Sequence, residues 1–298
     1  MKILILFGIS LVLFVSCSQD YQISDDDFTY IIEEPAYTEG SGPVVLVDAA
    51  HNNFHTIDGR YSPFAKLLRS DGYIVKSGTV EITPELLNSC RIFVTSVAMP
   101  IAGGSAYTNE EIVTLKDWVE KGGSLFLITD HHPDVPAVVK LADAFGVELN
   151  NGYALEGNPN VPKPILFSRE DNTLREHPIT VGTNENERIS FVATFTGCAF
   201  KADPRYSPIL VFRSGAVSWM PEEDWTFDAG TEKVNIGGWY QGAAAGIGKG
   251  RIAVFGEAAM FTAQLFGRER VPSGLNSPEA EYNAQFLLNI MHWLSLRL

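Results

Sequence analysis

Short, largely apolar segments that alternate with helical patterns constrain the fold of this chain more than any other feature. The segments cover residues 44–47, 73–75, 91–95, 124–128 and 251–256. A strand that is apolar on both faces is typical of a parallel sheet covered by helices on both sides. The alternation therefore predicts a mostly parallel open α/β sheet flanked by helices, with right-handed crossovers.

The most clearly marked helix begins with a capping box. Thr108 is suited to the N-cap position, Glu111 follows three positions later, and Gly122 marks the end. Further helices are predicted at residues 64–68, 135–145 and about 278–296. Residues 147–250 place strand-like runs among Pro, Asn and Gly, which predicts an antiparallel, loop-rich extension of the sheet rather than a second domain.

Polar residues gather directly after three of the predicted strands. Four of the six histidines lie in the first two of these loops. Because ligands bind beyond the carboxyl ends of strands in open α/β sheets, we expect one polar cleft there. The residues expected to bind the ligand are Asp48, Asn52, Asn53 and His132, and those expected to be catalytic are Asp130, His131 and Glu257.

Two chemistries fit these residues. His51 and His55 lie four positions apart, so on a helix both rings would face one side and could hold a divalent metal such as zinc, although Asn52 stands where the helical zinc-protease motif has Glu. Alternatively, Asp130 and Glu257 form a general acid/base pair and a histidine transfers protons without a metal. The sequence leaves both open, along with the possibility that these side chains only cap loops.

Several aromatic residues fall in the loop-rich middle of the chain. Side chains of this kind either stack on the rings of a bound sugar or pack the irregular region. The residues concerned are Tyr153, Trp219, Trp225, Trp239 and Tyr240.

The amino-terminal segment has the layout of an export signal. Lys2 precedes an apolar run from Ile3 to Val15, which ends at Ser16-Cys17 like the site of lipoprotein signal peptidase. We therefore expect a signal peptide over residues 1–16, a lipidated tether over 17–42 and one domain over 43–298. Acylation of Cys17 would anchor the protein in the cell envelope, on the periplasmic or surface face of a Gram-negative outer membrane.

The charge of the chain restricts its partners. The formal net charge is −14 and no basic patch is evident, which argues against nucleic acid and against electrostatic attraction to anionic lipid. We expect membrane contact through the acyl chains only, and a small polar ligand. The sequence does not specify an oligomeric state.

Three segments together resemble a bacterial domain family of unknown function. They are DAAHNNFHTIDGRY, GGSLFLITDHHP, and GKGRIAVFGEAAMFTAQ before a final QFLLNIMHWL. The family has the class I glutamine-amidotransferase-like fold and is related to trehalose-utilisation-type domains. The resemblance covers roughly residues 43–298 and implies a flavodoxin-like sheet and an association with polysaccharide-degrading enzymes. Asp130-His131-His132 stands where the amidotransferases carry their catalytic cysteine, so glutaminase activity is not expected.

Two functions remain as hypotheses. The first is a lipid-anchored hydrolase-like or accessory protein of carbohydrate utilisation. The second is a non-catalytic lipoprotein in which the same cleft holds a ligand or partner.

Overall fold

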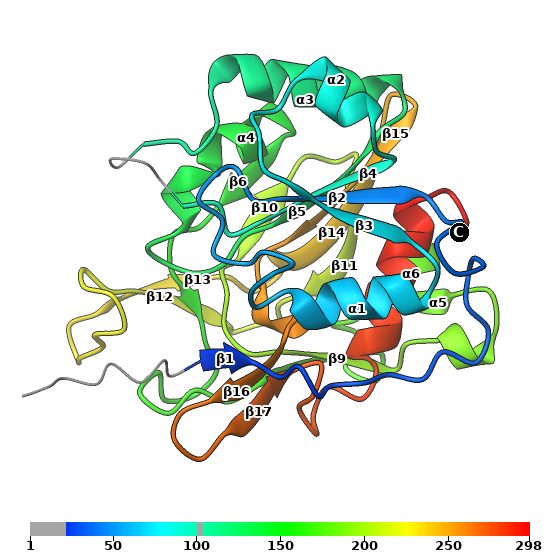
Figure 1. Ribbon diagram of the computed structural model, residues 1–298. Coiled ribbons are helices and arrows are strands. Elements are labelled where there is room, and N and C mark those ends of the chain that lie inside the picture. Colours follow the sequence, from blue (N-terminus) through cyan, green and yellow to red (C-terminus); the bar gives the residue numbers. More distant parts are fainter. Residues whose placement is uncertain (1–21, 100–103) are drawn as a thin grey trace, which may run out of the picture.

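The computed structural model describes residues 22–99 and 104–298. Its centre is a nine-stranded sheet with the order β3-β2-β4-β5-β15-β14-β10-β6, in which β11 also pairs with β14. The first five of these strands are parallel and lie side by side in one half of the sheet (Figure 1). They are β2 (Val44–Asp48), β3 (Ile74–Gly78), β4 (Ile92–Ser96), β5 (Ser124–Ile128) and β15 (Gly250–Phe255).

The remaining strands of this sheet extend it in antiparallel fashion. They are β14 (Tyr240–Ile247), β10 (Phe200–Ala202), β6 (Val147–Leu149) and β11 (Ser207–Val211). The expected mixed α/β sheet with an antiparallel extension is therefore present.

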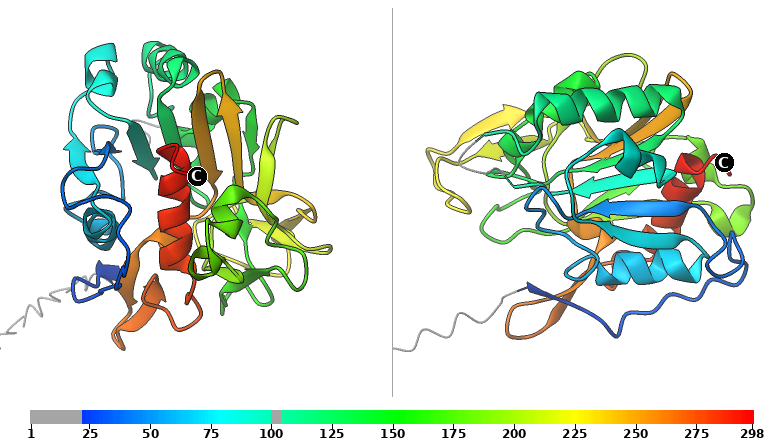
Figure 2. Two further views of the ribbon diagram at one scale, coloured as in Figure 1. Left: turned by 90° about the vertical axis from the view of Figure 1, so that its right-hand side faces the viewer. Right: turned by 45° about the horizontal axis from the view of Figure 1, so that its top comes forward.

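Helices cover both faces of the sheet (Figures 1 and 2). On one face, α1 (Ser62–Ser70) and α6 (Asn283–Leu294) pack on alternate strand residues such as Val45 and Val47. On the other, α2 (Pro84–Asn88), α3 (Asn109–Lys121) and α4 (Val139–Ala144) pack on the intervening residues such as Leu46. No helix within the described residues is long and apolar enough to cross a membrane.

Smaller elements surround the sheet. One small sheet joins β7 (Tyr153–Ala154), β12 (Val217–Met220) and β13 (Glu232–Asn235), and β8 (Ile165–Ser168) pairs with β9 (Phe191–Thr194). The short helical turns are α5 (Pro178–Val181), η1 (Val135–Ala137), η2 (Glu185–Glu187) and η3 (Ala259–Phe261).

The capping box predicts one helix well and general periodicity predicts others less well. In α3 the Thr108 hydroxyl accepts from the Glu111 amide, and the Glu111 carboxylate accepts in return from the Thr108 amide. The helix predicted at 135–145 is instead divided into η1 and α4, and α6 begins five residues later than expected. At that start the Asn283 side chain bonds the backbone of Ala193 in β9, which ties the helix to a distant strand that no local pattern specifies.

Residues 22–42 differ from the expected tether. The strand β1 (Gln22–Ser24) pairs with β16 (Ala263–Phe266), which in turn pairs with β17 (Val271–Gly274). Further on, aromatic side chains such as Tyr30 and Tyr37 pack on the core beneath α1 and α6. Burial of these rings offsets the entropy of ordering the segment, so from Gln22 onward it is part of the domain. The predicted signal peptide and Cys17 lie outside the described residues.

Candidate functional site

The carboxyl ends of β2, β5 and β15 meet at one edge of the sheet, as predicted, but the expected cleft divides between two faces. Asp48 lies two positions after Leu46, on the side of α3. Asp130 and Glu257 each lie two positions after Ile128 and Phe255, on the side of α1 and α6. Because strand side chains alternate between faces, the polar residues form two separate clusters.

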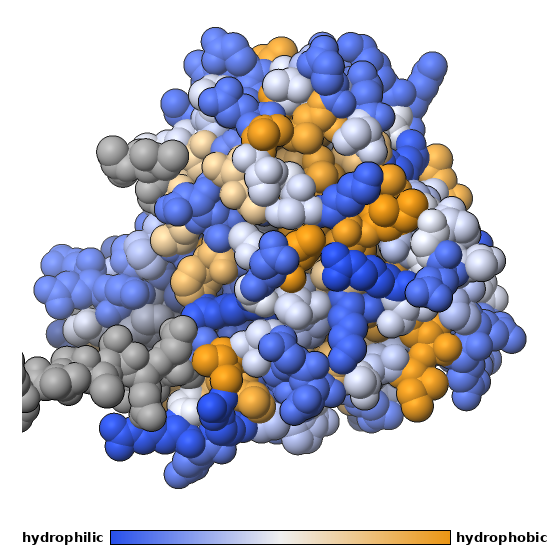
Figure 3. Space-filling view, viewed as in Figure 1, coloured by the Kyte–Doolittle hydropathy of each residue, from blue (hydrophilic) through white to orange (hydrophobic). Residues whose placement is uncertain are grey.

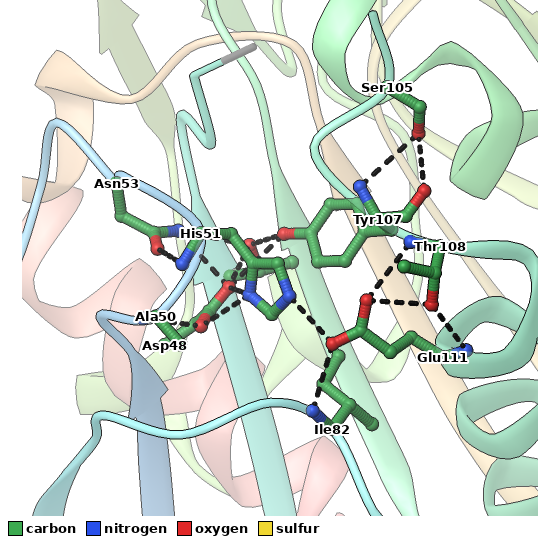
Figure 4. Close-up of polar contacts among 10 residues, drawn as sticks. Asp48, Ala50, His51, Asn53, Ile82, Ser105, Tyr107, Thr108 and Glu111 are labelled. Atoms are coloured by element: carbon green, nitrogen blue, oxygen red, sulfur yellow. Dashed lines mark hydrogen bonds and ion pairs between the residues drawn. The ribbon is translucent and has the colours of Figure 1, made fainter. Parts of the chain in front are cut away.

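In the first cluster, His51 is held between two carboxylates (Figure 4). Its Nδ1 lies 2.9 Å from both carboxylate oxygens of Asp48, and its Nε2 lies 3.0 Å from Oε1 of Glu111. Burial by itself would lower the pKa of His51, but the two carboxylates together raise that pKa. The ring therefore favours the charged form, and both of its nitrogens are occupied.

The carboxylates of this cluster are saturated by other donors as well. Asp48 also accepts from the Ala50 amide, the Asn53 side chain and two hydroxyls, those of Thr95 and Tyr107. Glu111 accepts from the Ile82 amide at 3.0 Å and from the Thr108 amide at 2.9 Å. These bonds, and that of His51, lower the pKa of Glu111 although its burial opposes the shift. The cluster is a closed internal network that joins β2, β4 and α3.

The proposed metal ligands His51 and His55 do not form a site. Residues 49–61 contain no helix, so the spacing of four does not place the rings side by side. His55 is buried and stacked on Tyr61 with 4.9 Å between ring centroids, and its Nδ1 has no hydrogen-bond partner. Among the described residues no three His, Cys, Asp or Glu side chains converge on a possible metal position.

The remaining residue expected to bind ligand in this loop, Asn52, is exposed and adopts a positive φ of 52°. Its neighbour Asn53 turns inward, where its amide also donates to the Ser96 carbonyl. Asn53 therefore belongs to the first cluster.

His55 does not carry a charge near neutral pH. Burial, followed by the charge of Arg60, lowers the pKa of His55 to about 3, so this ring stays neutral and serves packing.

The second cluster contains a buried carboxyl pair. Glu257 is fully covered, and its two oxygens accept from the amides of Ala259 and Met260 at 2.9 and 2.8 Å. Asp130 retains 8% exposure and accepts from the His131 amide. Burial raises the pKa of both carboxyls; the charge of Asp130 adds to the shift in Glu257, whereas His131 opposes the shift in Asp130. The pair therefore favours keeping a proton, and of the two carboxyls only that of Asp130 retains any exposure to solvent.

His131 stands at the mouth of this cluster in a defined orientation. Its Nδ1 lies 2.5 Å from the carbonyl of His132, and because a carbonyl only accepts, Nδ1 carries the hydrogen. The Nε2 atom lies 3.8 Å from Oδ1 of Asp130. The half-buried His132 thus contributes its backbone carbonyl, and the imidazole of His131 turns Nε2 toward the carboxyl.

Two aromatic residues enclose the His131 ring. Tyr153 stacks on it with 4.4 Å between centroids, and Trp225 meets it edge-on at 5.1 Å. The Tyr153 hydroxyl donates to Asp224, which fixes the loop that carries Trp225. Trp225 is 43% exposed, so part of its indole faces solvent. Burial chiefly, with the nearby charge of Asp130, raises the pKa of Asp134 to about 6, so a third carboxyl close to His131 titrates near neutrality.

The other predicted aromatics have different surroundings. Trp219 packs beneath Lys233, Trp239 beneath Lys201, and Tyr240 lies in β14.

Four further residues of the two clusters were not predicted from the sequence as site residues. They are Glu111, Tyr107, Tyr61 and Asp224. The capping box marks Glu111 only as a helix residue, and no local signal connects Asp224 with Tyr153 across more than seventy positions.

A cavity of about 480 Å³ lies away from both clusters. Among its lining residues are Arg175, Arg213 and Asn235, next to the glycine pair at 237–238. It shares no residue with either cluster.

No protein-family model matches the chain, and no curated protein matches its sequence. Among solved structures, the "mmIFT52 N-terminal domain" is similar with a TM-score of 0.56 at 16% identity, covering 85% of this chain and 97% of that one. A ThuA-like protein from Bacteroides uniformis has a TM-score of 0.47 at 13% identity, covering 89% and 94%. A GMP synthase protein from Thermoplasma acidophilum has a TM-score of 0.45 at 8% identity, covering 85% and 94%. At these identities the first similarity concerns the α/β fold alone.

Proposed function

We propose that this chain is a lipid-anchored envelope protein of carbohydrate utilisation that binds a saccharide where Asp130, His131 and Trp225 meet. The observation that carries the proposal is the combination of a partly open carboxyl, an oriented imidazole and an exposed indole at the carboxyl edge of the parallel strands. Ligands of open α/β sheets bind at this edge. We assign the sheet to the class I glutamine-amidotransferase-like type as part of the same proposal.

The chemistry of these groups suits a polyhydroxylated ligand. The exposed part of the Trp225 indole offers an apolar face on which the C–H face of a sugar ring can stack. The part of Asp130 that stays exposed and the Nε2 atom of His131, which lies 3.8 Å from the Asp130 carboxylate, can exchange hydrogen bonds with hydroxyl groups, although Asp130 also accepts from the Ala258 backbone and the Thr196 side chain. A few placed polar groups beside an aromatic surface are the usual composition of a small-molecule site.

Binding without cleavage accounts for Glu257 better than hydrolysis does. Glycosidases use two carboxyl groups that flank the scissile bond, so both must reach the substrate. Glu257 is fully covered and bonded to two backbone amides. Its role in this proposal is to hold the turn after β15 in place.

A hydrolase remains the second candidate because of one observation. The hydrogen on Nδ1 of His131 leaves Nε2 as a base that faces Asp130, whose own pKa is raised by burial. A base and an acid side by side are what proton transfer to a substrate requires. Asp130-His131-His132 holds no cysteine, so a glutaminase is not proposed.

A glycan-binding screen with the mature protein tests the proposal and separates the candidates. We expect binding to one class of saccharide with no new reducing ends after prolonged incubation, and weaker binding by Trp225→Ala. Phe266→Ala, which removes a similarly exposed aromatic from β16, serves as the control. Turnover of the bound saccharide that disappears in Asp130→Asn would instead favour the hydrolase, and the absence of any glycan ligand would contradict the proposal.

A further inference from the structure

The small sheet β1-β16-β17 places the amino-terminal end of the described chain against a particular surface. Gln22 pairs with Phe266, and Phe266 pairs on its other side with Val271. Cys17 precedes Gln22 by five positions, and five fully extended residues span at most about 18 Å. If Cys17 carries acyl chains, Gln22 therefore lies within that distance of the anchor, and Phe266 lies only one strand spacing, about 5 Å, further away.

The surface at this point has the composition of a membrane-contacting element. Phe266 is 49% exposed and Val271 is 50% exposed, and they form a cross-strand pair at the end of the hairpin. The connecting residues are Gly267, Arg268, Glu269 and Arg270, so two arginines flank one glutamate and the tip has a net positive charge. In the space-filling view, hydrophobic atoms lie directly beside strongly hydrophilic ones over β16 and β17 (Figure 3). Aromatic and apolar side chains beside arginines are typical of segments that lie in the interface of a bilayer.

The attachment of residues 22–42 to the domain keeps this hairpin near the anchor. Beyond β1, the Lys66 ammonium donates to the carbonyls of Asp26 and Phe28, and the Ala36 amide donates to Asp71. A flexible tether over the whole of 17–42 would let the domain turn freely. The bound segment instead leaves only the residues before Gln22 between the anchor and the hairpin.

We propose that the tip of the β16–β17 hairpin, Phe266 to Val271, inserts into the headgroup region of the membrane and orients the domain. The partner is a phospholipid surface. This inference rests on the lipid anchor of the proposed function. The acyl chains supply the affinity, and the hairpin fixes which face of the domain meets the bilayer. It replaces our expectation that only the acyl chains touch lipid.

Site-specific labelling of the lipidated mature protein tests this. A polarity-sensitive fluorophore is attached at Phe266→Cys, in a Cys90→Ser background because Cys90 is half-buried and Cys198 is buried, and the protein is placed in vesicles of phosphatidylethanolamine and phosphatidylglycerol. We expect a blue shift and quenching by lipid-borne quenchers. The same label at Val113→Cys, which is 60% exposed on α3, serves as the control and should keep its aqueous emission.

The outcomes separate this inference from the anchor. If mass spectrometry shows acylated Cys17 but the label at position 266 keeps the same aqueous emission as that at 113, the hairpin proposal is overturned and the anchor stands. An unmodified Cys17 overturns both. A second label at Arg268→Cys, at the tip itself, should repeat the blue shift if the hairpin inserts.

Discussion

Tyr153 stacks on His131 with 4.4 Å between ring centroids and 23° between ring planes. The two residues come from β7 and from the loop after β5, so the contact joins the small sheet to the edge of the central sheet. It holds the imidazole with Nδ1 on a backbone carbonyl and Nε2 toward Asp130. The ligand site that we propose depends on this orientation.

Because the network around His51 is closed and internal, we expect a substitution of His51 to lower the stability of the protein and to leave saccharide binding unchanged. In His51→Ala two buried carboxylates, Asp48 and Glu111, lose the cation between them. Removal of one partner from a buried charged pair costs about 3 kcal/mol. Chemical denaturation at neutral pH should show a loss of that order, with saccharide binding by the folded fraction unchanged. An unchanged midpoint would show that the network contributes little.

His55 predicts how stability responds to acid. In the unfolded chain a histidine takes up a proton near pH 6.5, roughly its ordinary pKa, whereas folded His55 does so only near about 3. Because the pKa of His55 is lowered in the folded state, the neutral ring contributes fully to the free energy of unfolding above roughly pH 6.5. That contribution is lost as the pH falls, at up to about 1.4 kcal/mol per pH unit.

The variant His55→Phe keeps a ring against Tyr61 and removes the titrating group. Its free energy of unfolding should therefore fall less steeply than that of the wild type between roughly pH 6.5 and pH 4. Denaturation curves at several pH values measure this. Two parallel profiles would show that His55 is protonated as readily in the folded state as in the unfolded chain.

We expect the contacts of Asp71 to hold residues 22–42 against the domain. One of its oxygens accepts from the Ala36 amide and the other from Nε2 of His292, both at 2.7 Å. Asp71→Ala leaves these buried donors unpaired, at a cost of about 2–4 kcal/mol. We expect faster proteolytic cleavage within 25–42 than in the wild type. Asp27→Ala, an exposed position in the same segment, should leave the cleavage rate unchanged, and equal rates in both variants would contradict the role of Asp71.

The sequence predicts the fold more completely than the site. Continuous apolar runs identify the buried parallel strands, and the Thr108 capping box and Gly122 give the two ends of α3, because these signals are local. The division of the polar cleft depends on which face each side chain occupies where its strand ends. Asp48 is the last residue of β2 and Asp130 lies two positions beyond β5, and the two lie on opposite sides of the sheet.

Two further predictions, the tether and the metal pair, failed because contacts between residues far apart in the sequence decide these features. The acidic composition of residues 17–42 indicates a tether, but Asp71 and the core beneath α1 bind the part from Gln22 onward. Likewise, the spacing of His51 and His55 suggests a metal pair only if the loop is helical. Glu111, from a helix sixty positions away, occupies the nitrogen of His51 that a metal would need.

Calorimetric titration of the saccharide found by the glycan screen is the most direct test of the proposed site. We expect Trp225→Ala to weaken binding roughly five-fold, because losing one aromatic contact costs on the order of 1 kcal/mol, and we expect His131→Ala to weaken it as well. Phe266→Ala should bind like the wild type. Equal affinities for all four proteins would contradict the assignment of the site to His131 and Trp225.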